Sequence, residues 1–269
     1  MGKRKNLVEV SFKLSLEEHY DLLKEIIAVD KNVELNKEKV FNWAVENNNT
    51  KLVSLLIQIT DVTEDDNYAI KVAAKEGYAE IVKQLIDAGA DLTADGNYAI
   101  RHAAENGRTE VVKLLIDAGA DVTAGNNWAI RYAAENGHTE TVKLLIEYGA
   151  DVTAQDNYAI RYAAEGGHTE VVKLLIDAGT DVTDVTAWGN DAIIRATING
   201  HAEIVKLLID AGANVTANTI RYAEAYGHTE VAKMLIEARS DADDYSIKSV
   251  FLDYISSQIR KLKNFLENL

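Results

Sequence analysis

Cysteine and proline are both absent from the 269 residues of this chain. Without cysteine the chain cannot form disulfides, thiolate zinc sites or a cysteine nucleophile, and a reducing compartment such as the cytoplasm fits best. No apolar run approaches the roughly 18 residues that a membrane helix needs. The N-terminal segment begins with basic residues at Lys3 to Lys5 but has no apolar stretch. We therefore expect neither a secretory signal nor a membrane segment.

Positive charge is scarce relative to negative charge. Lysine and arginine number 28 against 43 aspartates and glutamates, so the formal net charge is −15. Such a surface repels phosphate backbones, and we expect no nucleic-acid partner. The acidity is typical of plain solubility, and a basic protein partner is the alternative interpretation.

Motifs for catalysis are missing as well. The chain has no glycine-rich phosphate loop, no HExxH and no GxSxG, so we expect no catalytic or cofactor-binding residues and no enzyme. His138, His168, His201 and His228 stand at equivalent positions of a repeated pattern. Packed helices lie about 8–10 Å apart whereas zinc–nitrogen bonds are about 2 Å, so these histidines cannot share one metal ion. We expect them to support turns, and we expect no metal site.

A repeat dominates the middle of the chain. Residues 157–178 read NYAIRYAAEGGHTEVVKLLIDA, and near-copies begin at Asn67, Asn97 and Asn127, with a looser one at Asn190. Apolar residues at helical spacing predict two short helices per copy. We expect asparagine to cap the first helix and the threonine after the Gly-His pair to cap the second. Such short helices are unstable alone, so neighbouring copies must stack to form the core.

The run GHTEVVKLLIDAGTDVT, with an Ala-Ala pair before it, resembles the second half of an ankyrin repeat. The resemblance covers most of residues 35–240 and implies an all-α ankyrin-repeat solenoid of stacked helix-turn-helix units. The first half departs from the family, because Tyr158 to Arg161 stand where it usually has Thr-Pro-Leu-His. This 30-residue NYAIR-type repeat implies short hairpin loops and is similar to the repeats of giant DNA viruses.

We expect one continuous domain with a distinct segment at each end. Residues 1–34 read as a degenerate N-terminal capping repeat, residues 35–240 as about seven ankyrin repeats, and residues 241–269 as a longer C-terminal capping helix. In this last segment the sequence of residues 244–248 is similar to that of residues 67–71. Its apolar residues from Leu252 to Leu269 have coiled-coil spacing over a short length, which leaves two roles open: capping the solenoid or self-association.

The family resemblance implies a protein-binding module whose concave face and hairpin tips contact a partner. Trp188, on the one hairpin of full family length, is the best single candidate, although it could equally pack beneath that hairpin. The candidate partner-binding residues are Asp66, Lys75, Glu76, Gly96, Glu105, Asn106, Asn126, Glu135, Asn136, Asp156, Glu165, Trp188, Ile198, Asn199 and Tyr226.

Two sets of residues recur at the same position in successive repeats and form ladders. The sequence allows two interpretations for each ladder. Arg101, Arg131 and Arg161 each precede a glutamate by four residues, which favours a solvated, charge-balanced face, with a polar recognition strip as the alternative. The aromatic residues at positions 68, 98, 128 and 158 favour either a binding surface or simple space filling.

The partner implied by the resemblance is a protein, and the resemblance to viral repeats implies a host protein met in the host cytoplasm. We expect a monomer, and the alternative is a homodimer formed through residues 252–269.

Overall fold

The computed structural model describes residues 37–182 and 190–240, together with residues 256, 259, 260 and 263. The chain divides into two compact units, residues 1–129 and residues 130–269, which are called unit 1 and unit 2 below. The regular elements in the described ranges are all helices. None of these helices is long and apolar enough to cross a membrane.

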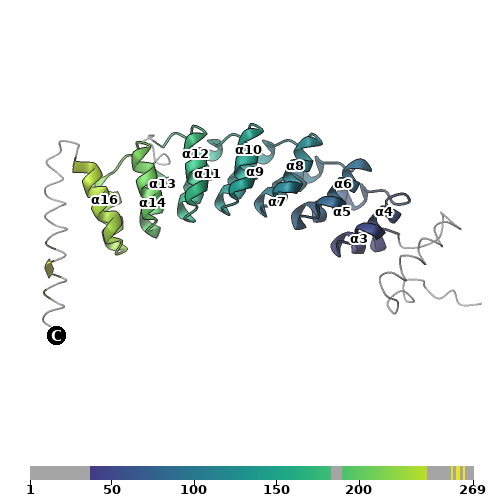
Figure 1. The fold of residues 1–269 in the computed structure, drawn as a ribbon, viewed down its shortest axis with the longest axis horizontal. Coiled ribbons are helices and arrows are strands. Elements are labelled where there is room, and N and C mark those ends of the chain that lie inside the picture. The colour runs from purple at the N-terminus through teal and green to yellow at the C-terminus, as the bar shows by residue number, and fades with distance from the viewer. Residues whose placement is uncertain (1–36, 183–189, 241–255, 257–258, 261–262, 264–269) are drawn as a thin grey trace, which may run out of the picture. The chain divides into compact units, whose positions relative to one another are not determined.

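The helices follow one another in pairs along the chain (Figure 1). Those of unit 1 are α3 (Lys37–Glu46), α4 (Thr50–Leu56), α5 (Glu64–Glu76), α6 (Ala79–Asp87), α7 (Ala94–Glu105) and α8 (Thr109–Asp117). The boundary between the units falls inside α9 (Ala124–Glu135). Those of unit 2 are α10 (Thr139–Glu147), α11 (Ala154–Glu165), α12 (Thr169–Asp177), α13 (Asp191–Asn199), α14 (Ala202–Asp210), α15 (Ala217–Ala225) and α16 (Thr229–Ser240).

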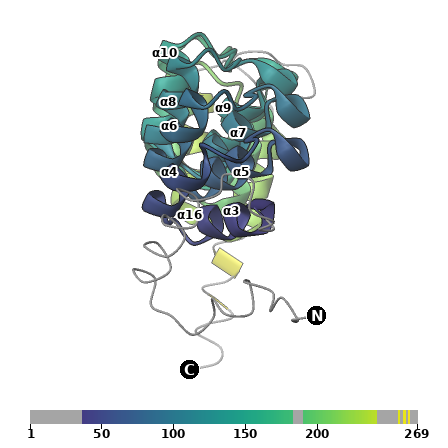
Figure 2. The ribbon, with the colours of Figure 1, turned by 90° about the vertical axis from the view of Figure 1, so that its right-hand side faces the viewer.

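Each pair packs against the next within its unit. In unit 1 the first helices α3, α5 and α7 contact one another in order, and the second helices α4, α6 and α8 do the same. Figure 2 shows these two sets as neighbouring columns. In unit 2, α11, α13 and α15 contact in order, as do α10, α12, α14 and α16. The predicted all-α architecture of stacked helix-turn-helix units is confirmed within each unit.

The core lies between the helices of each pair and between neighbouring pairs. On α11 the predicted inward residues Ile160, Ala163 and Ala164 are buried. On α12 Val172 and Leu175 are fully buried. Small alanines let the helices approach closely, and complete burial of one valine or leucine side chain contributes about 1.5–3 kcal/mol. The prediction of these faces from 3.6-residue periodicity is confirmed.

The helix ends differ in part from the prediction. Gly167 and Gly179 end their helices with positive φ, as expected. Asn157 does not cap α11, because it has left-handed backbone angles and its Nδ2 donates to the carbonyl of Asp181 at 3.5 Å. The cap position of α12 is His168, and Thr169 is the first helical residue. The expected threonine cap is therefore wrong by one residue.

The missing asparagine cap has a conformational cause. Residues 155–157, immediately before the regular part of α11, all have φ near +60°. Residues 65–67, 95–97 and 125–127 have the same left-handed conformation. These three successive left-handed residues stand where the family has its proline turn. They form the short hairpins that the 30-residue period predicts.

Three of the sequence-based assignments lie mainly or wholly outside the described residues. They are the N-terminal capping repeat at 1–34, the hairpin of Trp188, and the C-terminal segment 241–269 apart from residues 256, 259, 260 and 263.

Candidate interaction surface

The hairpin tips present exposed residues at regular intervals. Asp66, Gly96, Asn126 and Asp156 are the central residues of the four left-handed turns, and all four are exposed. The segment that precedes each tip forms a turn, which is held by hydrogen bonds between an aspartate and a threonine. The Asp91 carboxylate accepts hydrogen bonds from the Thr93 backbone N–H at 2.8 Å and from its hydroxyl at 2.7 Å. These bonds lower the pKa of Asp91. The same threonine N–H bond recurs at Asp61, Asp121 and Asp151, so these aspartates hold the turns.

The aromatic residues that begin the first helices serve packing between repeats. Tyr158 is half-buried, and its hydroxyl donates to Glu135 Oε2 at 2.7 Å. Burial and this bond raise the pKa of Tyr158 above its ordinary value. The Arg131 guanidinium lies 5.0 Å from the centroid of the same ring. Of the two roles left open by the sequence, the structure favours space filling between neighbouring helices.

The arginine ladder is not the solvated face that the sequence favoured. Arg131 and Arg161 are only 9 % and 8 % exposed, because the next first helix covers them. The Arg101 guanidinium donates to the carbonyl of Asp95 at 2.9 Å. That bond lies within α7, whereas the contacts of Arg131 with Tyr158 and of Arg161 with Asp191 join neighbouring first helices. Little of the ladder is left exposed as a recognition strip.

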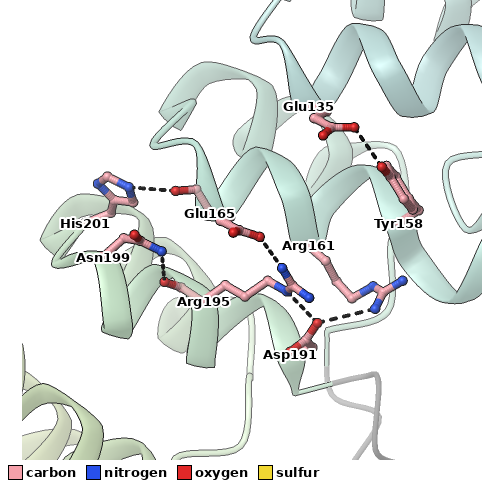
Figure 3. Close-up of polar contacts among 8 residues, drawn as sticks. All are labelled: Glu135, Tyr158, Arg161, Glu165, Asp191, Arg195, Asn199 and His201. Atoms are coloured by element: carbon pink, nitrogen blue, oxygen red, sulfur yellow. Dashed lines mark hydrogen bonds and ion pairs between the residues drawn. The ribbon is translucent and has the colours of Figure 1, made fainter.

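A charged network replaces the aromatic contact between α11 and α13 (Figure 3). Asp191 stands where α5, α7, α9 and α11 have an aromatic residue. Its Oδ2 lies 3.3 Å from Arg161 Nη1 and 2.6 Å from Arg195 Nε. Arg195 also forms an ion pair with Glu165. Burial alone would lower the pKa of Arg195, but its bonds to the two carboxylates raise it overall.

The histidines of unit 2 bridge neighbouring pairs. The Nε2 atoms of His168 and His201 each lie 2.9 Å from a backbone carbonyl of the preceding repeat, that of Glu135 and that of Glu165. His228 contacts the carbonyl of Ile198 at the same distance. Because a carbonyl only accepts, each Nε2 carries the proton. The predicted role as turn supports is confirmed for these three of the four histidines.

The predicted partner-binding residues lie at the surface wherever they are described. In unit 1, Asp66, Lys75, Glu76, Gly96 and Asn126 are exposed, and Glu105 and Asn106 are half-buried. In unit 2, Asn136, Asp156, Asn199 and Tyr226 are exposed, and Glu135, Glu165 and Ile198 are half-buried. Glu135 and Glu165 already bond to Tyr158 and Arg195. Trp188 lies outside the described residues.

One part of this surface was not predicted from the sequence. Tyr222 is 39 % exposed and stands one helical turn from Tyr226, which is 59 % exposed. Arg221 beside it is exposed as well. Tyr222 aligns with the half-buried Tyr162, so the repeat pattern predicts that Tyr222 is half-buried too. In the structure no described first helix follows α15 to cover it.

Metal-site geometry does not occur in the described ranges, where no three residues of the types His, Cys, Asp and Glu gather as metal ligands would. Each unit offers exposed hairpin tips and amide side chains, and unit 2 also offers two exposed tyrosines. These groups can bind another macromolecule by shape, hydrogen bonds and aromatic contact.

Comparison with known proteins agrees with this arrangement. The family model described as "Ankyrin repeats (3 copies)" matches residues 12–95, 70–156 and 160–246. A crystal structure of an ankyrin repeat domain from Acinetobacter baumannii AYE is similar, with 29 % sequence identity and a TM-score of 0.56 over 64 % of this chain and 98 % of that one. No curated protein matches the chain. Ankyrin repeats are generally non-catalytic protein–protein interaction modules, and because the family match extends over most of its length, the chain belongs to the ankyrin-repeat family.

Proposed function

We propose that this chain binds a partner protein through its hairpin tips and the exposed ends of its first helices, the side that is concave in ankyrin solenoids. Packed helices hold these residues in place, so little conformational entropy is lost on binding. The proposal includes no catalytic step and no cofactor.

The observation that carries the proposal is the tyrosine pair at the C-terminal end of α15, with Tyr222 inside the helix and Tyr226 directly after it. Tyr226 and Tyr222 are exposed, whereas the aromatic residues of the other first helices in unit 2 are half-buried. Asn199 occupies the position of Tyr226 on the adjacent helix α13 and is exposed too. Tyrosine is enriched in binding surfaces because it combines a large rigid ring with a polar hydroxyl.

Capture experiments with matched variants test the proposal. Tyr226→Ala removes the most exposed tyrosine of this surface, and Tyr148→Ala removes a tyrosine of 42 % exposure at the end of the second helix α10. We expect Tyr226→Ala to reduce capture of the partner from a cytosolic lysate at least about tenfold, as a central contact residue does. Tyr148→Ala leaves capture unchanged. Equal capture by both variants and the parent contradicts the proposed surface.

The similarity of the repeats to those of giant DNA viruses extends the proposal to the origin of the partner and to the cellular location. A viral origin makes the partner a host protein and the location the host cytoplasm. The tagged chain, expressed in host cells, is then recovered with its partner in the cytosolic fraction. Recovery in the nuclear or membrane fraction contradicts this part of the proposal.

Self-association through residues 252–269 is a second candidate, favoured by one described residue. Ile259 is 51 % exposed and belongs to the apolar residues with coiled-coil spacing in this segment. If a homodimer forms there, sedimentation velocity at tens of micromolar detects it and Ile259→Glu abolishes it. A monomer at that concentration excludes this candidate.

A further inference from the structure

Two first helices of unit 2 end at an asparagine that is followed by glycine. Asn136 comes directly after α9 and precedes Gly137, and Asn199 is the last residue of α13 and precedes Gly200. Both asparagines are exposed. Because glycine has no Cβ and a mobile backbone, its nitrogen can approach the side-chain amide of the asparagine before it. The two pairs therefore offer little steric hindrance to a reaction between backbone and side chain.

The reaction that such a pair permits is deamidation through a succinimide ring. The glycine nitrogen gives its proton to the solvent and attacks Cγ of the asparagine, and the bond from Cγ to Nδ2 breaks. Nδ2 takes up a proton and leaves as ammonia. One water molecule then opens the ring and yields aspartate or isoaspartate. Water is the only co-reactant, so this modification needs no enzyme, cofactor or oxidant.

In the folded chain both reacting groups of the first pair are held by hydrogen bonds. Asn136 Nδ2 donates to the Tyr132 carbonyl at 2.9 Å. The Gly137 N–H donates to the Ala134 carbonyl at 3.1 Å. Ring closure has to break both bonds, because the glycine nitrogen must turn away from this carbonyl and reach Cγ. The reaction therefore requires that the last turn of the helix opens.

The second pair is held in the same way. Asn199 Nδ2 donates to the Arg195 carbonyl at 2.9 Å (Figure 3). The Gly200 N–H donates to the Thr197 carbonyl at 3.2 Å. The same opening of the last turn is therefore needed at α13.

A histidine of the following repeat closes over the first pair. His168 Nε2 lies 2.9 Å from the carbonyl of Glu135, the residue before Asn136. Its ring packs directly on the glycine, since a Cβ at Gly137 would lie 2.5 Å from His168 Nδ1. The turn around Asn136 cannot open without losing these contacts.

His228 closes over the second pair with the same geometry. Its Nε2 lies 2.9 Å from the carbonyl of Ile198, the residue before Asn199. A Cβ at Gly200 would lie 2.5 Å from His228 Cε1, so this ring also packs on the glycine. Each asparagine–glycine turn of unit 2 thus has its own cover from the next repeat.

We propose that Asn136 and Asn199 are sites of spontaneous deamidation, and that His168 and His228 limit the reaction, each at the turn that it covers. The carboxylate of the product cannot donate to the Tyr132 carbonyl as the amide does. It also places a negative charge at the C-terminal end of a helix, where the helix dipole is already negative. Each event therefore weakens the last turn of a first helix and adds charge at a candidate partner-binding residue.

Peptide mapping by mass spectrometry follows each asparagine separately while the full-length chain is incubated in mildly alkaline buffer, with and without urea. In the folded parent we expect both to deamidate at least about tenfold more slowly than in urea, because only the fraction with an opened turn reacts. His168→Ala should raise the rate of Asn136 about threefold to tenfold, the range that loss of one hydrogen bond gives, and leave Asn199 unchanged. His228→Ala should accelerate Asn199 and leave Asn136 unchanged.

Arginine provides a matched replacement, because the chain uses it at the histidine position in unit 1. Arg108 Nε donates to the Lys75 carbonyl at 3.2 Å, and a Cβ at Gly77 would lie 2.7 Å from Arg108 Cδ. His168→Arg should therefore keep the rate of Asn136 closer to that of the parent than His168→Ala does. Far-UV circular dichroism during the incubation verifies that each variant stays helical.

Three results overturn the proposal. If the folded parent reacts as fast as the chain in urea, the turns do not protect the asparagines. If neither asparagine deamidates in urea, the two pairs are not modification sites. If each histidine variant accelerates both sites equally while the chain stays helical, the histidines do not act on the turns that they cover. No partner takes part in these measurements, so a failure here is distinct from a failure of the proposed function.

Discussion

The Arg195 guanidinium lies 4.5 Å from the ring centroid of Tyr162, and the two residues join α13 to α11. Arg195 stands at the position that Tyr162 itself occupies in the preceding repeat. The irregular repeat of α13 therefore keeps the contact between neighbouring first helices. A cation over an aromatic ring takes the place of a pair of aromatic rings. The ion pairs of Arg195 with Asp191 and Glu165 complete the exchange.

Loss of the Asp191 carboxylate is expected to destabilise unit 2. Asp191→Ala removes this carboxylate from the 8 % exposed Arg161 and lowers the free energy of unfolding by about 2–3 kcal/mol, because the buried cation then loses its ion-pair partner although its bond to the Gln155 carbonyl remains. Urea denaturation measures the change. Asp117→Ala is the control, since its ion pair with Lys113 is exposed and contributes about 1 kcal/mol at most. Equal losses in the two variants contradict the account of the network.

The histidine bridges are expected to stabilise contacts between repeats more than the arginine at the equivalent position does. His201→Ala removes the bond to the Glu165 carbonyl and lowers the free energy of unfolding by about 1–2 kcal/mol. Arg108 occupies the histidine position in unit 1, and its exposed guanidinium bonds to the Lys75 carbonyl at 3.2 Å. Arg108→Ala should therefore have the smaller effect on the urea midpoint. A larger effect for Arg108→Ala refutes this ranking.

The left-handed conformation of the hairpin tips strains residues other than glycine, and substitutions there measure this backbone strain. Gln155 has φ 56° and ψ 52°, which is costly for a residue that is not glycine, asparagine or aspartate. Gln155→Gly should raise the thermal midpoint, with a gain of about 1 kcal/mol in the free energy of unfolding.

Two glycines at these tips provide the reverse test. A Cβ at Gly96 meets nothing within 4 Å, so Gly96→Ala costs only the backbone strain of about 1 kcal/mol. At Gly125 the Cβ would also approach Arg101 Cδ at 3.3 Å, so Gly125→Ala is expected to cost more. If both alanine variants are as stable as the parent, the left-handed conformation is wrong.

The aspartate–threonine turns predict a pH dependence of stability. Hydrogen bonds from Thr63 and Thr93 lower the pKa values of Asp61 and Asp91 in the folded chain below those of the unfolded chain. The resulting stabilisation is present above the unfolded pKa of about 3.9 and is lost as the pH falls through the folded values. The urea midpoint of the parent should therefore approach that of Asp91→Asn as the pH is lowered from about 6 to 3. A constant difference over this range shows that the carboxylate charge has no role in the turn.

The repeat pattern was sufficient to predict the helix pairs, the buried Ile160 and Leu175, and the structural role of His168. These features follow from local periodicity and glycine placement, which the sequence displays directly. The asparagine caps could not be predicted correctly, because three successive left-handed residues are rare and propensities favour asparagine at a cap as well as in this conformation. The burial of Arg161 was missed because its partner, Asp191, belongs to the next repeat.

The candidate surface was predictable to a different extent. Exposure of Tyr226 and of the tips followed from their alignment with family positions. Tyr222 was missed because its alignment with Tyr162 predicts half-burial, and only the three-dimensional position of α15 shows that no described helix covers it. The role of the Trp188 side chain as a contact residue stays a prediction.

Oxidative footprinting of the purified complex tests the central claim most directly, because it reports which side chains the partner covers. After capture and mass-spectrometric identification of the partner, hydroxyl-radical labelling compares Tyr226 with Tyr148, which are 59 % and 42 % exposed in the free chain. The account predicts that the bound partner lowers the oxidation rate of Tyr226 several-fold and leaves that of Tyr148 unchanged. Protection of Tyr148 without protection of Tyr226 would contradict it.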